Sequence, residues 1–244
     1  MPPWPTHTLA PTDLVVGPCA WRIGMLADHA DYVLAHRSLV VITPDDDDAL
    51  LAAAAPQLAD LPVMLIMPEP SFARRFPGSI ESRMQALGRD RLDALMLHVD
   101  DVTELKSGGL LQTMFDLRTS NVVTHLGLAS DDPRGVEWLA GNTAVRLLGV
   151  PYSLTDQAVR HRALPAAAEY GMAAVALTSP ADEAGLRFAL AERERVLPLL
   201  DRPLPETWPA MSEDEVEAAW QRFQADQPPP AALPRGRPPV GDES

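Results

Sequence analysis

The chain has 244 residues, of which 46% are hydrophobic, so it is long enough for one sizeable domain with an ordinary apolar core. Its formal net charge of −14 makes the surface repel phosphate backbones, which argues against nucleic acid as a partner. No apolar run approaches the roughly 20 residues of a membrane span, no secretory signal begins the chain, and the single cysteine, Cys19, excludes an intrachain disulfide, so we expect a cytoplasmic protein without a membrane partner.

Short apolar runs alternate with segments of helical periodicity along most of the chain. We predict strands at residues 14–21, 38–44, 62–68, 92–98, 122–130, 144–153, 172–180 and 196–200. We predict helices at residues 28–37, 49–59, 79–88, 109–121, 131–141, 154–171, 181–195 and 212–223. The strands are continuous rather than alternating apolar runs, which is typical of a parallel sheet covered on both faces.

Local signals predict where several of these helices begin and end. Asp28 is a plausible N-cap of the first helix, and Pro56 is expected to interrupt the second. Gly88 stands where the third helix stops. Ser212 is followed three residues later by Glu215, which is a capping box at the start of the last helix.

The number of strands favours a barrel over an open doubly wound sheet. About eight βα units fit the length, and no GxGxxG turn follows the first strand. The fold class that we predict is therefore α/β, an (β/α)8 TIM barrel over residues 12–223. Residues 1–11 are expected to be a flexible N-terminus, and residues 224–244 a Pro-rich disordered tail.

The stretch from Ser79 to Asp101, SIESRMQALGRDRLDALMLHVDD, resembles the helix and strand that precede the active-site histidine of aldo-keto reductases. The matching positions are Ser82, Leu87, Gly88, Asp90, Asp93, Leu97 and His98. Later segments resemble successive strands of the same family, and VPYSLTDQAV and LPAAAEYGMAAVALTSP look closest to its aldose dehydrogenase-like branch. The resemblance implies a barrel of aldo-keto reductase type, trimmed around the last βα unit.

The resemblance also implies an active site, in which His98 is the counterpart of the family's substrate-orienting histidine. The family pairs that histidine with a proton-donating Tyr and with a Lys and an Asp that make the phenol more acidic. Here the place of the Lys falls at Met67 or Pro68, beside Glu69, whose charge has the opposite sign. The place of the Tyr falls in TPDDDDAL, where Asp45 stands for the family's Asp.

The positions that hold the family's nicotinamide cofactor are altered as well. Ser130 falls in the place of an Asn, and Thr178 replaces the Tyr that stacks on the nicotinamide ring. The segment that usually grips the cofactor phosphate after the last strand is missing. We therefore expect no bound cofactor, unless the active site has been reassigned, in which case the expected cofactor is NADPH.

Several other residues are candidates for a ligand pocket at the mouth of the barrel. Trp21 could form a wall and Arg22 could hold a carboxylate, although an Arg paired with local acids is at least as reasonable in so acidic a chain. Tyr152 resembles a structural tyrosine of the family. His98 and Asp100 have the spacing of metal ligands, but no further histidine falls at a strand end, so we expect no metal.

Together these observations leave three functional hypotheses. The first is an aldo-keto reductase-like protein with a degenerate active site, which serves as a binding or scaffolding subunit for a protein partner. The second is an NAD(P)-dependent oxidoreductase with reassigned residues, which uses His98 and Asp45. The third is a cofactor-free acid/base enzyme that uses Glu69 and His98. The small-molecule ligand stays open in all three.

Overall fold

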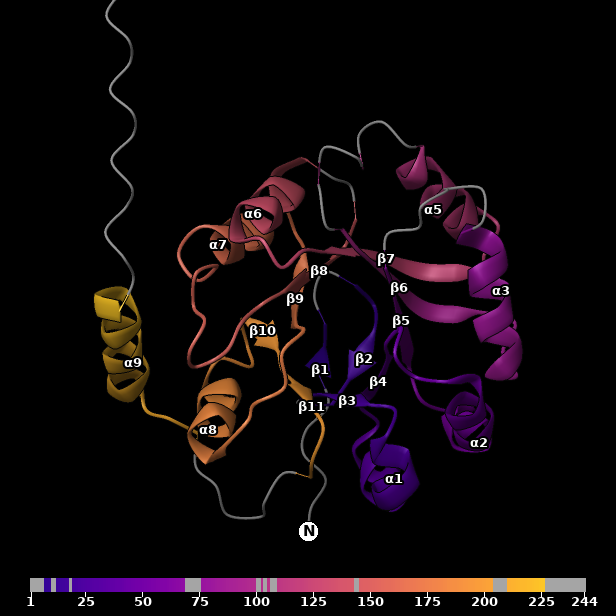
Figure 1. Ribbon diagram of the computed structural model, residues 1–244, viewed down its shortest axis with the longest axis horizontal. Helices are drawn as coiled ribbons and strands as arrows, with labels where there is room; N and C mark the ends of the chain where they lie inside the picture. The colour runs from indigo at the N-terminus through magenta and orange to yellow at the C-terminus, as the bar shows by residue number, and fades with distance from the viewer. Residues whose placement is uncertain are drawn as a thin grey trace, which may run out of the picture.

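The fold is a barrel of parallel strands surrounded by helices (Figure 1). The computed structural model describes residues 7–9, 12–17, 19–68, 76–99, 102, 105, 109–142, 145–203 and 210–226. Its strands are β1 His7–Thr8, β2 Val15–Val16, β3 Ala20–Arg22, β4 Leu39–Ile42, β5 Val63–Pro68, β6 Leu92–His98, β7 Val123–Ala129, β8 Leu147–Val150, β9 Ala173–Ala176, β10 Val196–Leu197 and β11 Leu199–Leu200. Its helices are α1 Met25–His36, α2 Asp48–Leu58, α3 Phe76–Ala86, α5 Leu110–Thr119, α6 Pro133–Asn142, α7 Ala163–Glu169, α8 Glu183–Ala191 and α9 Glu213–Asp226.

The barrel closes through the shortest strands of the sheet. Strands β3 to β9 pair in chain order and in parallel, β10 pairs with β9, and β11 pairs with β3. Only Pro198 separates β10 from β11, and its carbonyl accepts a hydrogen bond of 2.8 Å from the Ala20 N–H. The two pieces therefore act as one last strand, and the predicted (β/α)8 barrel is confirmed.

Alternation along each strand sorts the apolar side chains into two layers. One layer fills the barrel interior, and β6 contributes Ala94 and Met96 to it. The other lies between the strands and the surrounding helices, and β6 contributes Leu95 and Leu97. Both faces of β6 are therefore apolar along most of its length, which is why such strands read as continuous hydrophobic runs in the sequence.

Two glycines make room for Met96 at the centre of the barrel. A Cβ atom added to Gly149 would lie 2.6 Å from the Met96 sulfur and 2.5 Å from the Ala129 Cβ. A Cβ atom added to Gly127 would lie 3.1 Å from the Met96 Cε. The interior is thus packed solid below the mouth, as in other barrels of this size.

A two-stranded hairpin covers the amino-terminal end of the barrel. Strand β1 pairs antiparallel with β2, so part of the N-terminal segment 1–11 that we expected to be flexible is paired. Asp13, between these strands, accepts a hydrogen bond of 2.8 Å from the Nε2 atom of His125 on β7. The contact fixes the hairpin beneath the barrel floor.

The family-like stretch forms the same connection that its sequence predicts. Gly88 has a left-handed φ of 61° after α3, which is the conformation that favours glycine at a helix end. Arg89 then donates to the carbonyls of Leu58 and Leu61 and forms a 2.8 Å ion pair with Asp93. One guanidinium thereby ties β6 to the loop that follows α2.

Three details differ from the sequence predictions. Helix α1 begins at Met25 with Gly24 as its N-cap, so Asp28 is not the cap, and the helical backbone breaks at His29. Pro56 lies inside the last turn of α2 and does not end it, because a proline there removes only its own N–H donor. Residues 154–162 are not helical and end in turns at 158–162, so α7 is much shorter than predicted.

The first predicted strand, residues 14–21, is split in two. Its start is β2 of the floor hairpin, and its end is β3 of the barrel. At the other end of the chain, the described residues show one helix after β11, which is α9, so the last βα unit is trimmed as predicted. Figure 1 shows α9 beside α8 on the outside of the barrel.

Candidate functional site

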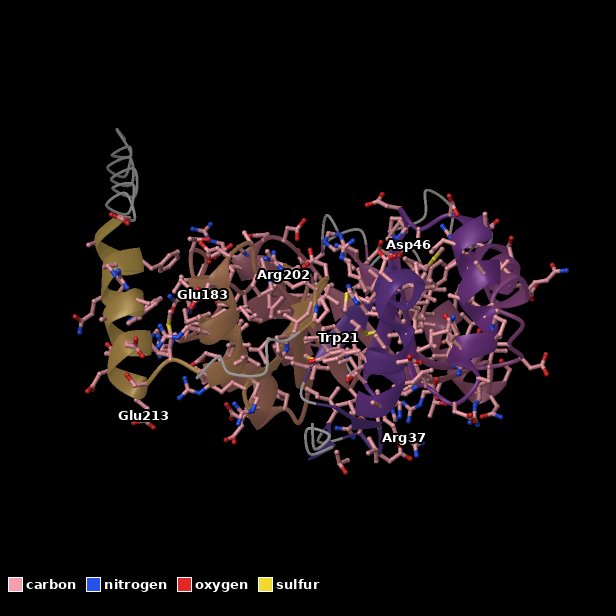
Figure 2. The ribbon with its side chains drawn as sticks, turned by 90° about the horizontal axis from the view of Figure 1, so that it is seen from below. Trp21, Arg37, Asp46, Glu183, Arg202 and Glu213 are labelled. Carbon is pink, nitrogen blue, oxygen red and sulfur yellow. The ribbon has the colours of Figure 1, made fainter. Side chains whose placement is uncertain are left out.

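The carboxyl ends of the parallel strands meet at one end of the barrel and form its mouth, where barrels of this type carry their sites. Figure 2 shows the barrel from the side, with Asp46 and Arg202 toward the mouth and Arg37 toward the floor. The mouth is therefore built from the residues that directly follow the strands.

His98 lies on the inner side of the mouth. It ends β6 and shares the inward face with Ala94 and Met96 by alternation. Its register partners on the neighbouring strands are Pro68 and Ala129. The histidine side chain is 23% exposed, so it can reach a molecule in the mouth while its strand holds it in place.

Asp131 fixes one edge of the His98 ring. Its Oδ1 atom lies 3.3 Å from His98 Nε2, and its own side chain is 78% exposed. A solvated ion pair of this kind contributes little to folding stability, so its main effect is to orient the imidazole. Asp131 follows β7 directly, and the sequence analysis did not single it out.

Ser130 lies behind the mouth rather than in it. It is buried, its Oγ atom accepts a hydrogen bond of 3.3 Å from the Asp132 N–H, and a Cβ atom at Gly135 would lie 2.8 Å from this oxygen. These contacts place it against the start of α6. Asp132 in turn accepts from the N–H groups of the first turn of α6.

The run of four acids after β4 is mostly occupied in local structure. Asp46 accepts hydrogen bonds from the Thr43 N–H and hydroxyl at 2.6 and 3.0 Å, and Asp47 caps α2 through the Leu50 N–H. Asp48 lies 3.5 Å from Arg83. Asp45 is exposed at the mouth. The run lies at the N-terminus of α2, where the helix dipole favours acidic side chains.

Trp21 and Arg22 point to opposite sides of β3. Trp21 is fully buried in the layer between strands and helices, and its ring makes an edge contact with Tyr32 of α1 at 5.4 Å. Arg22 shares the inward face with Ala20 and is half-buried at the strand end. Glu69 and Asp100 lie outside the described residues.

The described residues contain no cluster of three metal-ligating side chains. His98 stands at the mouth, whereas His125 is bound to Asp13 at the floor, so these two histidines lie at opposite ends of the barrel.

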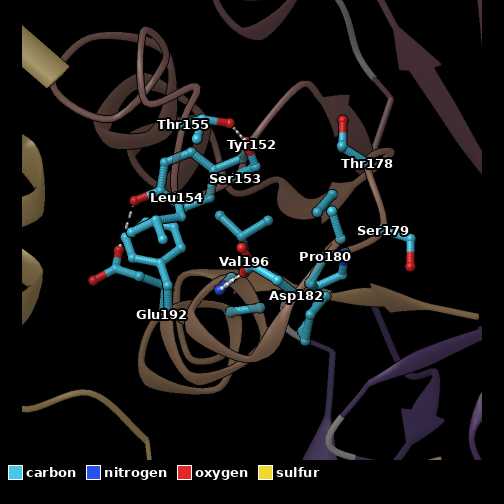
Figure 3. A pocket seen from close by; sticks show the side chains of 16 residues that line it. Tyr152, Ser153, Leu154, Thr155, Thr178, Ser179, Pro180, Asp182, Glu192 and Val196 are labelled. Atoms are coloured by element: carbon cyan, nitrogen blue, oxygen red, sulfur yellow. Dashed lines mark hydrogen bonds between the residues drawn. The ribbon is translucent and has the colours of Figure 1, made fainter. Parts of the chain in front are cut away.

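Tyr152 and Thr178 line a pocket on the outer side of the barrel wall (Figure 3). The Tyr152 hydroxyl donates a hydrogen bond of 2.9 Å to the Oε2 atom of Glu192. Burial and the neighbouring Glu192 carboxylate raise the pKa of Tyr152. This phenol is therefore a hydrogen-bond donor and a poor acid, which is the opposite of what a proton-donating tyrosine needs.

Glu192 and Asp182 are pocket residues that the sequence analysis did not single out. Asp182 is visible in the sequence as an N-cap, and its side chain accepts a hydrogen bond of 2.8 Å from the Gly185 N–H. Glu192 lies in the charged run AERER, where nothing marks one glutamate as buried. Only the packing of α8 distinguishes it.

The fold is similar to the barrel of solved aldo-keto reductases. An aldo-keto reductase from Pseudomonas aeruginosa superposes with a TM-score of 0.69 at 17% identity, covering 81% of this chain and 88% of that one. One from Bacillus halodurans gives 0.66 at 15% identity, covering 94% and 93%. One from Klebsiella pneumoniae gives 0.64 at 14% identity, covering 91% and 95%. The resemblance inferred from residues 79–101 is thus confirmed at the level of fold.

Comparison by sequence adds no relative. No family model matches the chain, and no curated protein matches it. Among the described residues, no helix has both the length and the apolar character that crossing a bilayer requires.

The expectation that no cofactor is bound is wrong. Two crystal structures of aldo-keto reductases from Klebsiella pneumoniae with this fold were solved with the cofactor, one in complex with NADP and acetate and the other with NADPH. The fold therefore points to a nicotinamide cofactor, although the usual sequence signals for one are altered in this chain.

Proposed function

We propose that this protein is an oxidoreductase that uses a nicotinamide dinucleotide and acts on a carbonyl or alcohol group at the barrel mouth. The observation that carries the proposal is His98, held on the inner face of β6 with Asp131 at 3.3 Å. Imidazole is the side chain that most readily exchanges a proton near neutral pH. The similar solved structures with bound NADP or NADPH support the choice of cofactor.

The residues beside β9 and β11 fit a dinucleotide. The Ser179 Oγ atom is buried and has no hydrogen-bond partner among the described residues. Arg202 donates to the carbonyls of Pro180 and Ala181 at 2.8 and 3.0 Å, which holds its positive charge beside the same loop. Ser179, the exposed Thr178 hydroxyl and Arg202 are the residues that would hold the phosphates.

The dinucleotide supplies or accepts the hydride when bound. The chain's own residues handle the proton and the position of the substrate. In the reducing direction, His98 donates a proton from its imidazolium to the substrate oxygen as negative charge develops there. Asp131 orients the ring. The apolar side chains around Met96 in the barrel interior exclude water from the inner side of the mouth.

A second candidate is a dinucleotide-binding subunit without turnover, which serves a protein partner. All three tyrosines of the chain lie away from the inner mouth: Tyr32 is on α1, Tyr152 is bound to Glu192, and Tyr170 is the exposed C-cap of α7. The single lysine, Lys106, lies outside the described residues. These positions favour a site that binds without the family's usual proton donor.

Steady-state kinetics with NADPH and a panel of small aldehydes separate the two candidates. We expect NADPH oxidation by the wild-type protein, and a loss of about 100-fold or more in kcat for His98→Gln with the Kd for NADPH unchanged. Asp60→Asn, which alters an exposed acid in the loop between α2 and β5, is the control and keeps kcat.

An unchanged kcat in His98→Gln would overturn the catalytic assignment. Saturable NADPH binding without oxidation of NADPH by any aldehyde would favour the non-catalytic subunit instead. The readouts differ because binding and turnover are measured separately on the same protein.

A further inference from the structure

A pocket lies between the barrel wall and α8, apart from the mouth. Ala176 of β9 and Val196 of β10 form its inner side, and both belong to the layer between strands and helices rather than to the barrel interior. Phe188 and Ala189 of α8 form the opposite side. Figure 3 shows Tyr152 and Glu192 at one end of the pocket, with Thr178 and Ser179 toward the other.

The pocket has apolar walls and acidic polar groups. The apolar lining includes Leu154, Ala176, Phe188, Ala189, Val196 and Pro198. Two carboxylates, Asp182 and Glu192, also line it, and none of the described lining residues is Lys, Arg or His. An anion would be repelled here, whereas a cation or a neutral donor would not. The electrostatics therefore differ from those of the mouth beside Arg202.

Glu192 occupies an unfavourable place for a carboxylate. It is the C-cap of α8, where the helix dipole opposes negative charge, and it is only 7% exposed. Its partners are the neutral Tyr152 hydroxyl at 2.9 Å and the mostly exposed Arg195 guanidinium at 3.4 Å. A cation in the pocket would supply the charge compensation that these two contacts give only in part.

We propose that this pocket is a second small-molecule site, which binds an amine whose ammonium group donates to Glu192 and whose apolar body packs against Phe188 and Val196. The cavity volume of about 130 Å³ is close to the roughly 150 Å³ of a cavity that binds one benzene molecule, so the pocket admits a ligand body of about one aromatic ring. The pocket adjoins the loop of Thr178 and Ser179, to which we assign the dinucleotide phosphates, and the ammonium group would bind at the opposite end, beside Glu192.

Three probes of matched size test the charge preference: 2-phenylethylamine, 2-phenylethanol and phenylacetate. Titration followed by NMR shifts or calorimetry is expected to rank them in that order, with phenylacetate the weakest. Glu192→Gln keeps the volume and the hydrogen bond to Tyr152, and it should weaken 2-phenylethylamine about tenfold or more while leaving 2-phenylethanol nearly unchanged. An equal affinity for the amine and for phenylacetate in the wild-type protein would overturn the proposal.

A second variant tests the location. Ala189→Phe fills the pocket from α8 and should abolish binding of both 2-phenylethylamine and 2-phenylethanol, while the circular dichroism spectrum stays as in the wild type. Binding of the amine to folded Ala189→Phe with wild-type affinity would place it elsewhere and refute the site. If Ala189→Phe does not fold, the Glu192→Gln titration decides, because that change is isosteric.

Discussion

Gly149 is the residue on which the packing of the barrel interior depends most directly. Gly149→Ala would press a methyl group against Met96 and Ala129, and we expect a loss of about 1–3 kcal/mol in the free energy of unfolding. Gly78→Ala is the control, because nothing lies within 4 Å of its added Cβ; it should be neutral or up to about 1 kcal/mol stabilising. Urea unfolding measures both, and equal stabilities for the two variants would show that Met96 moves aside.

For single residues, the sequence predicts the position within a strand or loop better than it predicts the contacts of the side chain. His98 was predicted to lie at the mouth because the sequence LDALMLH indicates both a strand and the carboxyl end of that strand. Trp21 was expected to form the wall of a pocket. The face of β3 on which a residue lies depends only on alternation along the strand, and Trp21 lies on the face that packs against Tyr32. Asp131 was missed because an ion pair between two strand ends depends on how the neighbouring strands align.

The last helix gives the clearest prediction at the scale of an element. The capping box of α9 is confirmed: the Ser212 N–H donates to Glu215 at 2.8 Å, and the Glu215 N–H is bonded to the Ser212 hydroxyl. Arg187 of α8 also donates to the Glu215 carboxylate, at 3.0 and 3.2 Å. The exposed Glu215 carboxylate therefore caps the start of α9 and also links α9 to α8.

These contacts make the attachment of α9 sensitive to acid. The hydrogen bond from the Ser212 backbone, followed by that from Arg187, lowers the pKa of Glu215. A lowered folded-state pKa means that the stabilisation is present above the unfolded pKa of about 4.3 and is lost as pH falls through the folded value. We expect Glu215→Gln to lower the Tm at pH 7 and to match the wild type at about pH 2.5.

The exposed Glu217 on the same helix provides the control. Glu217→Gln should leave the Tm at pH 7 unchanged, because the cap and the hydrogen bonds from Arg187 described above are made by Glu215. A difference between Glu215→Gln and the wild type that stays constant from pH 7 to pH 2.5 would mean that the carboxylate charge does not contribute.

Helix α8 shows which features of an element the sequence cannot supply. Its N-cap, Asp182, and its apolar face are readable, and the predicted helix is present. The pocket beneath it exists because small residues, Ala176 and Ala189, face each other across the gap between strand and helix. That juxtaposition depends on tertiary spacing, so neither the cavity nor the burial of Glu192 could be predicted.

For the whole molecule, the alternation of short βα units was sufficient to predict the barrel, and its closure by VLPLL was the weakest part of that prediction. Closure depends on two strands of two residues each, joined at Pro198, and on pairing with β3 at the other end of the chain. The altered motifs predict that no cofactor is bound, whereas solved structures with this fold contain NADP or NADPH, and this is why the expectation about the cofactor was wrong.

Direct binding of NADPH tests the central claim, that this barrel holds a nicotinamide dinucleotide at its mouth. Calorimetric titration of the purified protein is expected to give saturable binding with a Kd of about micromolar order. Arg202→Ala should weaken it about tenfold or more, and Arg91→Ala, which removes an exposed charge at the floor end of β6, should not. Absence of saturable binding by the folded wild-type protein would contradict the claim.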